Sequence, residues 1–188
     1  MKLNHLFLIC SLFAHSINAK EFSTIVPPDK DTIIVENMGD GKLYTEYSYT
    51  SVSPLVFYST SSSSERNDAW NQNVLPDTGK YENIVLRMGK NPSFLLFLKE
   101  LEDFLHVSLG TRFIRKLKAM GCNGYLSVIL DMNGYIAHVI VGFSNPEISN
   151  YIRCRDMYRL LRGLQIQKHY SIPQEYGKYL GYTIPIRL

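Results

Sequence analysis

Hydrophobic and polar residues alternate most clearly in two runs, Tyr125–Asp131 and Tyr135–Val141. An Asn133-Gly134 pair lies between them, and this pair is a strong short-range signal for a β-hairpin turn. In the second run the apolar spacing contains one three-residue step, which predicts a β-bulge at 137–138. The pattern therefore predicts a bulged hairpin in which His138 points to solvent.

Apolar residues recur at helical spacing before the hairpin. Residues 94–105 form such a pattern, and Ser93 is a suitable N-cap. A second, shorter helix is predicted over 111–120, where Gly121 stops it. The sequence thus predicts two helices in this region.

A third helix and a last strand follow the hairpin. The helix is predicted to start at Pro146 and to weaken or end at Gly163. Residues 179–188 alternate as a strand, and Pro185 indicates an edge strand because it cannot donate a ladder hydrogen bond.

The N-terminal part of the chain has a different texture. Residues 20–92 are rich in Ser, Thr, Tyr and Asn, with short strand-like runs at Thr32–Val35 and Leu55–Tyr58. They predict a Ser/Tyr-rich β-hairpin extension, with a mobile loop near 59–80 where apolar residues are few. Residues 93–188 form the second predicted unit.

The first 19 residues have the pattern of a secretory signal peptide. Lys2 precedes a short apolar run, and Ala19 is a suitable small residue at a cleavage site. We therefore expect a periplasmic protein without a transmembrane segment after cleavage, with the cell surface as the alternative. A lipid anchor on Cys10 is disfavoured because the bulky Ile9 precedes it.

Charge and cysteine content narrow the function classes. The formal charge of +3 falls by one when Lys2 is removed, and this is too weak to indicate a nucleic-acid partner. Cys122 and Cys154 remain, and we interpret them as small buried residues, with a disulfide as the alternative.

No catalytic residue, cofactor or metal site is predicted. Outside the signal segment the histidines are His106, His138 and His169, without a paired metal-ligand spacing. Nucleophile and phosphate-loop motifs are also missing from the sequence. A cysteine nucleophile served by one of these histidines stays open, because such partners meet in space rather than in sequence.

A basic face is predicted on the third helix. Arg155, Arg159 and Arg162 recur at i, i+4 and i+7. Such a face is usually only solvated, and an anionic partner such as a lipid headgroup or an acidic polymer is the alternative.

The order of these elements resembles the C-terminal domain of the TonB energy transducers, especially those of Bacteroidetes. The resemblance covers about residues 93–188 and rests on three segments: Gly121–Gly124, Asp131–Ile136 and Tyr182–Leu188. It implies a two-layer α+β fold, with helices packed on a small antiparallel three-stranded sheet. The β-rich N-terminal extension precedes this domain. The resemblance also implies that the last strand pairs with an extended partner peptide. The implied binding residues are Tyr182, Thr183, Ile184, Ile186 and Arg187.

The chain departs from that family in several places. The family's Tyr-Pro would fall at His106-Val107, and its Trp before the last strand is replaced within 164–166. The membrane helix and the proline-rich spacer are missing as well. We therefore expect a non-enzymatic interaction module for an envelope or outer-membrane protein. The alternatives are a homodimer through the same edge strand, a small ligand-binding domain and an enzyme.

Overall fold

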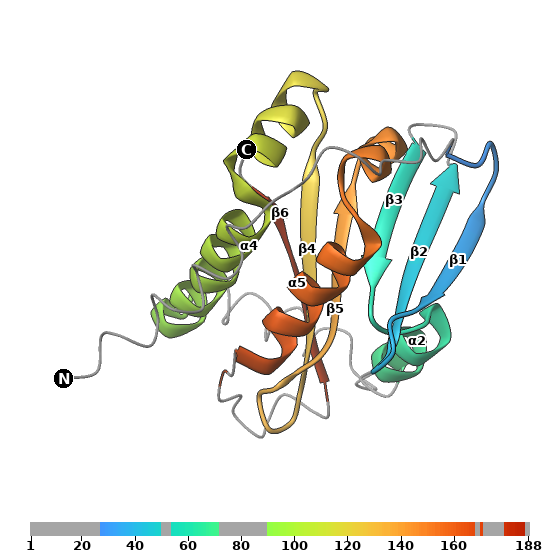
Figure 1. Cartoon of the computed structure of the whole chain (residues 1–188). Coiled ribbons are helices and arrows are strands. Elements are labelled where there is room, and N and C mark those ends of the chain that lie inside the picture. Colours follow the sequence, from blue (N-terminus) through green and yellow to red (C-terminus); the bar gives the residue numbers. More distant parts are fainter. Residues whose placement is uncertain (1–26, 50–53, 72–89, 168–169, 171–178, 187–188) are drawn as a thin grey trace.

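One antiparallel sheet of six strands organises the described part of the protein (Figure 1). The computed structural model describes residues 27–49, 54–71, 90–167, 170 and 179–186. The strand order is β1-β2-β3-β5-β4-β6. The strands are β1 (Thr32–Asn37), β2 (Lys42–Tyr49), β3 (Pro54–Ser59), β4 (Gly124–Asp131), β5 (Ile136–Phe143) and β6 (Tyr179–Ile186).

The expected small three-stranded sheet was wrong. β4, β5 and β6 do pair with one another, but β5 also pairs with β3, in a register that sets Val56 opposite Phe143 and Tyr58 opposite Val141. The second edge of β5 would otherwise leave its main-chain groups without hydrogen bonds, and β3 pairs with them. The apolar side chains of β3 also pack beside those of β5. The β-rich extension is therefore not a separate appendage, because its strands complete the same sheet.

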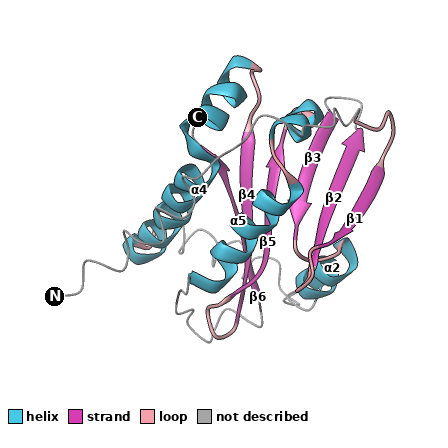
Figure 2. Cartoon of the chain, in the orientation of Figure 1, coloured by secondary structure: helices cyan, strands magenta, loops and turns pink. Residues whose placement is uncertain are grey.

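Helices α4 (Pro92–Ala119) and α5 (Cys154–Gln167) cover one face of this sheet (Figure 2). The strands direct alternate residues toward these helices, including Val56, Leu126 and Val139. These residues join buried apolar residues of α4 and α5 in one core. The core thus lies between the sheet and the two helices.

α4 contains both helices that were predicted before the hairpin. Its helical path breaks at Gly110, whose φ of 78° is in the region that favours glycine. The N-cap is Asn91 rather than Ser93, because the Asn91 Oδ1 accepts from the backbone N–H of Ser93 at 3.0 Å. The two predicted segments are confirmed, with a different cap.

The third predicted helix is divided in two. A 3-10 helix, η1, spans Pro146–Tyr151, and α5 begins only at Cys154. Gly163 lies inside α5 and does not end it. A Cβ at Gly163 would lie 2.9 Å from the ring of Phe104, so this glycine lets α5 approach α4 closely.

The predicted mobile loop near 59–80 was wrong for its first half. Helix α2 (Ser63–Asn71) forms there. Ser62 and Glu65 make a capping box: the Glu65 carboxylate accepts from Ser62 N at 2.7 Å, and Ser62 Oγ accepts from Glu65 N at 3.2 Å. These two hydrogen bonds stabilise the start of a helix that has few apolar residues. Residues 72–80 lie outside the described part.

The bulged hairpin is confirmed. Ile129 pairs with His138 and Leu130 pairs with Ile136, which leaves Ala137 as the extra residue. The side-chain amide of Gln165 on α5 donates to the Ala137 carbonyl at 3.0 Å. The solvent position expected for His138 was wrong, because this side chain is half-buried beneath the segment that leads into α2.

The signal peptide expected at 1–19 falls outside the described residues and stays a prediction. Within the described ranges, no helix has the length and apolarity that a membrane crossing requires.

Two leucines of α4 provide a test of this packing. Leu101 is fully buried, whereas Leu96 is 59% exposed. Leu101→Ala should lower the free energy of unfolding by about 2 to 5 kcal/mol, because it removes buried methyl groups and leaves a cavity. Leu96→Ala should change it by less than about 1 kcal/mol. Urea unfolding followed by circular dichroism measures both, and equal losses would contradict the assigned faces of α4.

Candidate functional site

Two rows of side chains cross the sheet on the face away from α4 and α5, which we call the open face. The strand registers place one residue of each strand in each row. The first row is Ile33, Glu46, Phe57, Gly142, Tyr125 and Pro185. The second row is Val35, Tyr44, Ser59, Ile140, Ser127 and Thr183.

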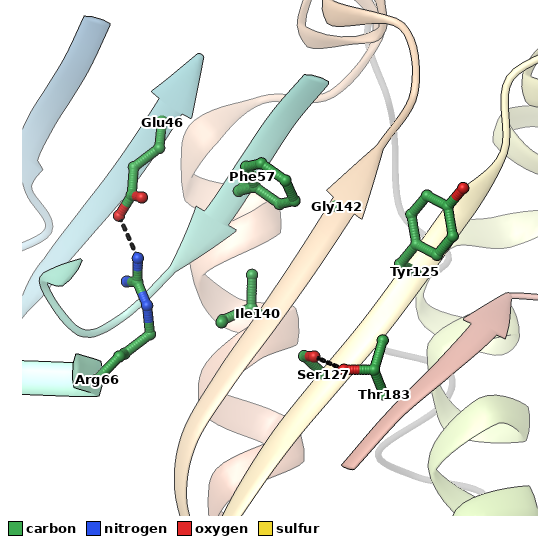
Figure 3. Close-up of a pocket in the computed structure, with 8 residues that line it drawn as sticks. All are labelled: Glu46, Phe57, Arg66, Tyr125, Ser127, Ile140, Gly142 and Thr183. Carbon is green, nitrogen blue, oxygen red and sulfur yellow. Dashed lines mark hydrogen bonds and ion pairs between the residues drawn. The ribbon is translucent and has the colours of Figure 1, made fainter. Parts of the chain in front are cut away.

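These rows enclose a shallow depression of about 330 Å³ between β2 and β6 (Figure 3). Small residues create the space. A Cβ at Gly142 would come within 2.7 Å of the Phe57 ring, so glycine lets this ring lie over β5. Further along, the hydroxyls of Ser127 and Thr183 are hydrogen-bonded to each other. The depression therefore has an apolar floor with a pair of hydroxyls beside β6.

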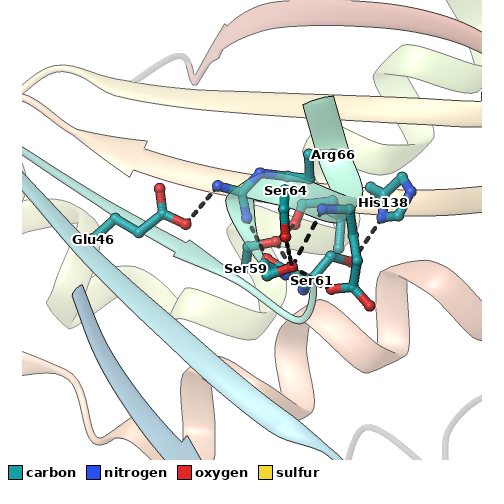
Figure 4. Close-up of polar contacts among 9 residues, drawn as sticks. Glu46, Ser59, Ser61, Ser64, Arg66 and His138 are labelled. Carbon is teal, nitrogen blue, oxygen red and sulfur yellow. Dashed lines mark hydrogen bonds and ion pairs between the residues drawn. The ribbon is translucent and has the colours of Figure 1, made fainter. Parts of the chain in front are cut away.

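Arg66 of α2 closes one end of the depression. Its Nη2 forms an ion pair with Glu46 Oε1 at 2.5 Å, and its Nη1 donates to the carbonyl of Ser61 (Figure 4). Both side chains of the ion pair are largely buried. Because the two charges compensate each other, this end of the depression is closed by a neutral pair.

His138 lies in the same polar network. Its Nδ1 and the Ser61 hydroxyl are 2.7 Å apart, and Ser61 N in turn donates to Ser59 Oγ at 3.1 Å. Burial lowers the pKa of His138, Arg66 lowers it further, and Glu65 opposes the shift. The network therefore favours a neutral imidazole, which joins the α2 segment to β5.

The depression combines paired polar groups with an apolar surface. Its charged and hydroxyl groups are paired with one another, and its remaining lining is mainly apolar. Among the residues that the structure describes, no three His, Cys, Asp or Glu side chains come together as metal ligands. An apolar floor of this kind favours contact with apolar groups.

The binding residues predicted in the last strand lie on β6, at one end of the strand order. Tyr182 and Ile184 are half-buried against the core, and Ile186 is buried. Thr183 instead points to the open face and lines the depression. Among the described strands, the main chain of β6 pairs with β4 alone. Arg187 lies outside the described residues.

Only two of the three arginines predicted as a basic face are exposed. Arg155 and Arg159 are exposed, while Arg162 is half-buried and donates to Gln165 Oε1 at 3.4 Å. Asp156 lies on the same helix, with one carboxylate oxygen 3.9 Å from Arg159 Nη1. The acid offsets part of the positive charge, and an anionic partner stays a prediction.

Both described cysteines are free thiols. Cys122 is buried, and burial raises the pKa of Cys154 to about 12, with a further contribution from the neighbouring Glu36 carboxylate. A thiol with this pKa stays protonated at neutral pH. Cys154 is thus poorly suited to act as a nucleophile.

Two features escaped prediction from the sequence. The Glu46–Arg66 ion pair was missed because residues near 66 were interpreted as loop, although Ser62 and Glu65 have the spacing of a capping box. The position of β1 at the other end of the sheet was also missed. The β-branched run Thr32–Val35 predicted a strand but gave no information about its neighbours.

Comparison with known proteins adds information about the fold. No protein-family model matches the sequence, and no curated protein matches it. A crystal structure of a DUF5043 family protein from Bacteroides uniformis is similar, with a TM-score of 0.54 and 12% sequence identity. The match covers 85% of this chain and 92% of that protein. At this identity the likeness shows a shared fold only, and the resemblance to TonB domains stays a prediction.

The high pKa of Cys154 predicts slow alkylation. At about pH 8 the thiolate fraction should be roughly a thousandfold lower than in the unfolded chain, so iodoacetamide should label Cys154 far more slowly in the native protein. Mass spectrometry of the labelled peptides reports each cysteine separately. Glu36→Gln should speed labelling, because it removes the carboxylate that disfavours the thiolate. Equal labelling rates in native and unfolded protein would contradict the assigned environment.

The lowered pKa of His138 predicts a loss of stability in mild acid. The unfolded chain binds a proton near the ordinary histidine pKa of about 6.5, whereas the folded state binds it only at lower pH. Stability should therefore be complete above about pH 6.5 and fall as the pH drops toward the folded pKa. Urea midpoints between about pH 7.5 and 5.5 measure this loss. His138→Gln should show a smaller loss over the same range, and an identical loss would refute the assignment.

Proposed function

We propose that this protein is a non-enzymatic interaction module that binds an extended segment of a partner protein along β6. The observation that carries the proposal is the place of β6, which ends the strand order of the described sheet. An outermost strand pairs on one side only, so its other main-chain groups are available to an added strand.

The length of β6 suits this role. It has eight residues, all of which pair with β4 in a continuous register. Because Tyr182, Ile184 and Ile186 pack toward the core, α4 holds β6 in place from one side. Phe94 of α4 contacts Tyr182 with ring centroids 5.1 Å apart. The strand is thereby held ready to receive a partner, which reduces the entropic cost of binding.

The depression gives the added strand a place for one side chain. A new strand would lie about 4.8 Å beyond β6, and every second residue would face the open side. Thr183 is small there, and Tyr125, which pairs with Pro185 in the neighbouring row, is 38% exposed. A long apolar side chain of the partner can therefore extend over Thr183 to contact Tyr125. The main chain supplies affinity in this arrangement, and the depression supplies selectivity.

The predicted signal peptide and the TonB resemblance support a bacterial envelope protein as the partner. Both are sequence-based expectations. The interaction site itself depends only on β6 and on the open face beside it.

A peptide selection tests this function. A displayed library of random twelve-residue peptides would be selected on the immobilised protein, and the bound peptide would be mapped by amide hydrogen exchange. We expect new protection within 179–186 and an apolar residue shared by the selected peptides. Tyr125→Ala should weaken binding about tenfold, because it removes the aromatic contact.

Tyr44→Ala is the matched control. Tyr44 lies on the same open face but on β2, four strands from β6 in the strand order. Its removal should leave the affinity unchanged. Selected peptides that protect other elements and leave β6 unprotected would overturn the proposal, as would the failure to select any peptide.

A further inference from the structure

The other end of the sheet, β1, carries an exposed apolar edge. The exposed fractions are 56% for Ile33, 37% for Ile34 and 50% for Val35. Within the described sheet β1 pairs only with β2, in a register without a bulge. Natural sheets protect such edges with lysine, proline or bulges, and β1 has none of the three within Thr32–Asn37.

Two acids flank the apolar residues of this edge. Asp31 is exposed just before β1, and its Oδ1 accepts from the backbone N–H of Tyr49 at 2.6 Å. Glu36 is half-buried on the helix-covered face, with its carboxyl beside Cys154. Neither acid lies within the run Ile33, Ile34 and Val35, so the edge is apolar and uncharged over these three residues.

We propose that β1 pairs in antiparallel fashion with β1 of a second copy, with the two-fold axis at Ile34. In this register Ile34 lies opposite its own copy, Ile33 opposite Val35, and Thr32 opposite Glu36. The pairs of Ile34 with its copy and of Ile33 with Val35 are then apolar, Thr32 faces the single charge of Glu36, and no like charges meet. The strand is therefore complementary to itself, which a two-fold symmetric interface requires.

The faces of the sheet also agree with this register. Directly opposed residues of paired strands lie on the same face, so Ile33 and Val35 of both copies gather on the open face. There they adjoin Tyr44, which is the neighbour of Val35 on β2. The helices of both copies remain together on the other face. The dimer thus forms one continuous sheet of twice the width.

The proposed contact between the two β1 strands is small. An edge of six residues is smaller than a standard interface of about 1,600 Å², so we expect a dissociation constant in the micromolar range. The β6 edges lie at the two outer ends of the dimer and stay accessible. The dimer is thereby bivalent toward a partner that binds β6.

Sedimentation velocity of the full chain over a wide concentration range tests the proposal. The wild-type protein should pass reversibly from monomer to dimer. Ile33→Lys should raise the dissociation constant at least tenfold, because it places a charge on the edge. Val107→Lys is the control, since Val107 is 71% exposed on α4, and it should behave as wild type. A wild-type monomer at all concentrations would overturn the proposal.

A cross-link locates the interface. Ile34→Cys places two thiols opposite each other across the two-fold axis, where the Cα atoms are within about 4.5 to 5.5 Å, a separation that a disulfide spans. Mild oxidation should give a covalent dimer, whereas Val107→Cys should give little. If the protein forms a dimer but Ile34→Cys gives no cross-link, the contact lies elsewhere and the β1 register is refuted. Growth into open-ended chains would also refute the two-fold arrangement. None of these outcomes affects peptide binding at β6, which the selection experiment tests separately.

Discussion

The pairing of β3 with β5 is the contact on which the rest of the structure depends. It consists of four residue pairs, from Val56 with Phe143 to Ser59 with Ile140. Tyr58 and Phe143 pack edge to face at 6.3 Å, and the Ser59 hydroxyl donates to the Val139 carbonyl at 3.0 Å. This contact joins the N-terminal strands to the hairpin. It therefore fixes both the width of the sheet and the two rows of the open face.

The same pairing separates the two edges for which we propose functions. Without it, β5 would be an edge and the depression would lose Phe57 and Glu46. With it, β1 and β6 lie at opposite ends of the strand order. They differ in kind: β6 has half-buried side chains that anchor it to the core, whereas β1 exposes Ile33 and Val35. One edge thus relies mainly on its main chain for recognition, and the other can add apolar side chains.

Local features of this fold could be predicted from the sequence, and long-range pairing could not. Asn133-Gly134, the apolar spacing of α4 and the step at Ala137 each act over a few residues, and the hairpin, the helices and the bulge were found. The β3–β5 pairing depends on Val56 meeting Phe143, which no local pattern encodes. Pro185 predicted an edge strand, and β6 does end the described strand order. Thr183 lines the depression, although it was predicted for strand pairing, and that role stays a prediction. Tyr125 and Phe57 were missed because a row across the sheet depends on strand order and register. Arg66 was missed because its helix was interpreted as loop.

The order of the strands also has a consequence for how the chain folds. Ser59 and Val139, joined across β3 and β5, are 80 residues apart, and Ser127 and Thr183, joined across β4 and β6, are 56 apart. Contacts between such distant residues make folding slow, because long loops must close before these strands can pair. During synthesis the hairpin emerges before β6, so β4 remains an open edge until the last strand has been made. A newborn chain therefore offers an acceptor for foreign strands at the position that its own C-terminal segment later fills.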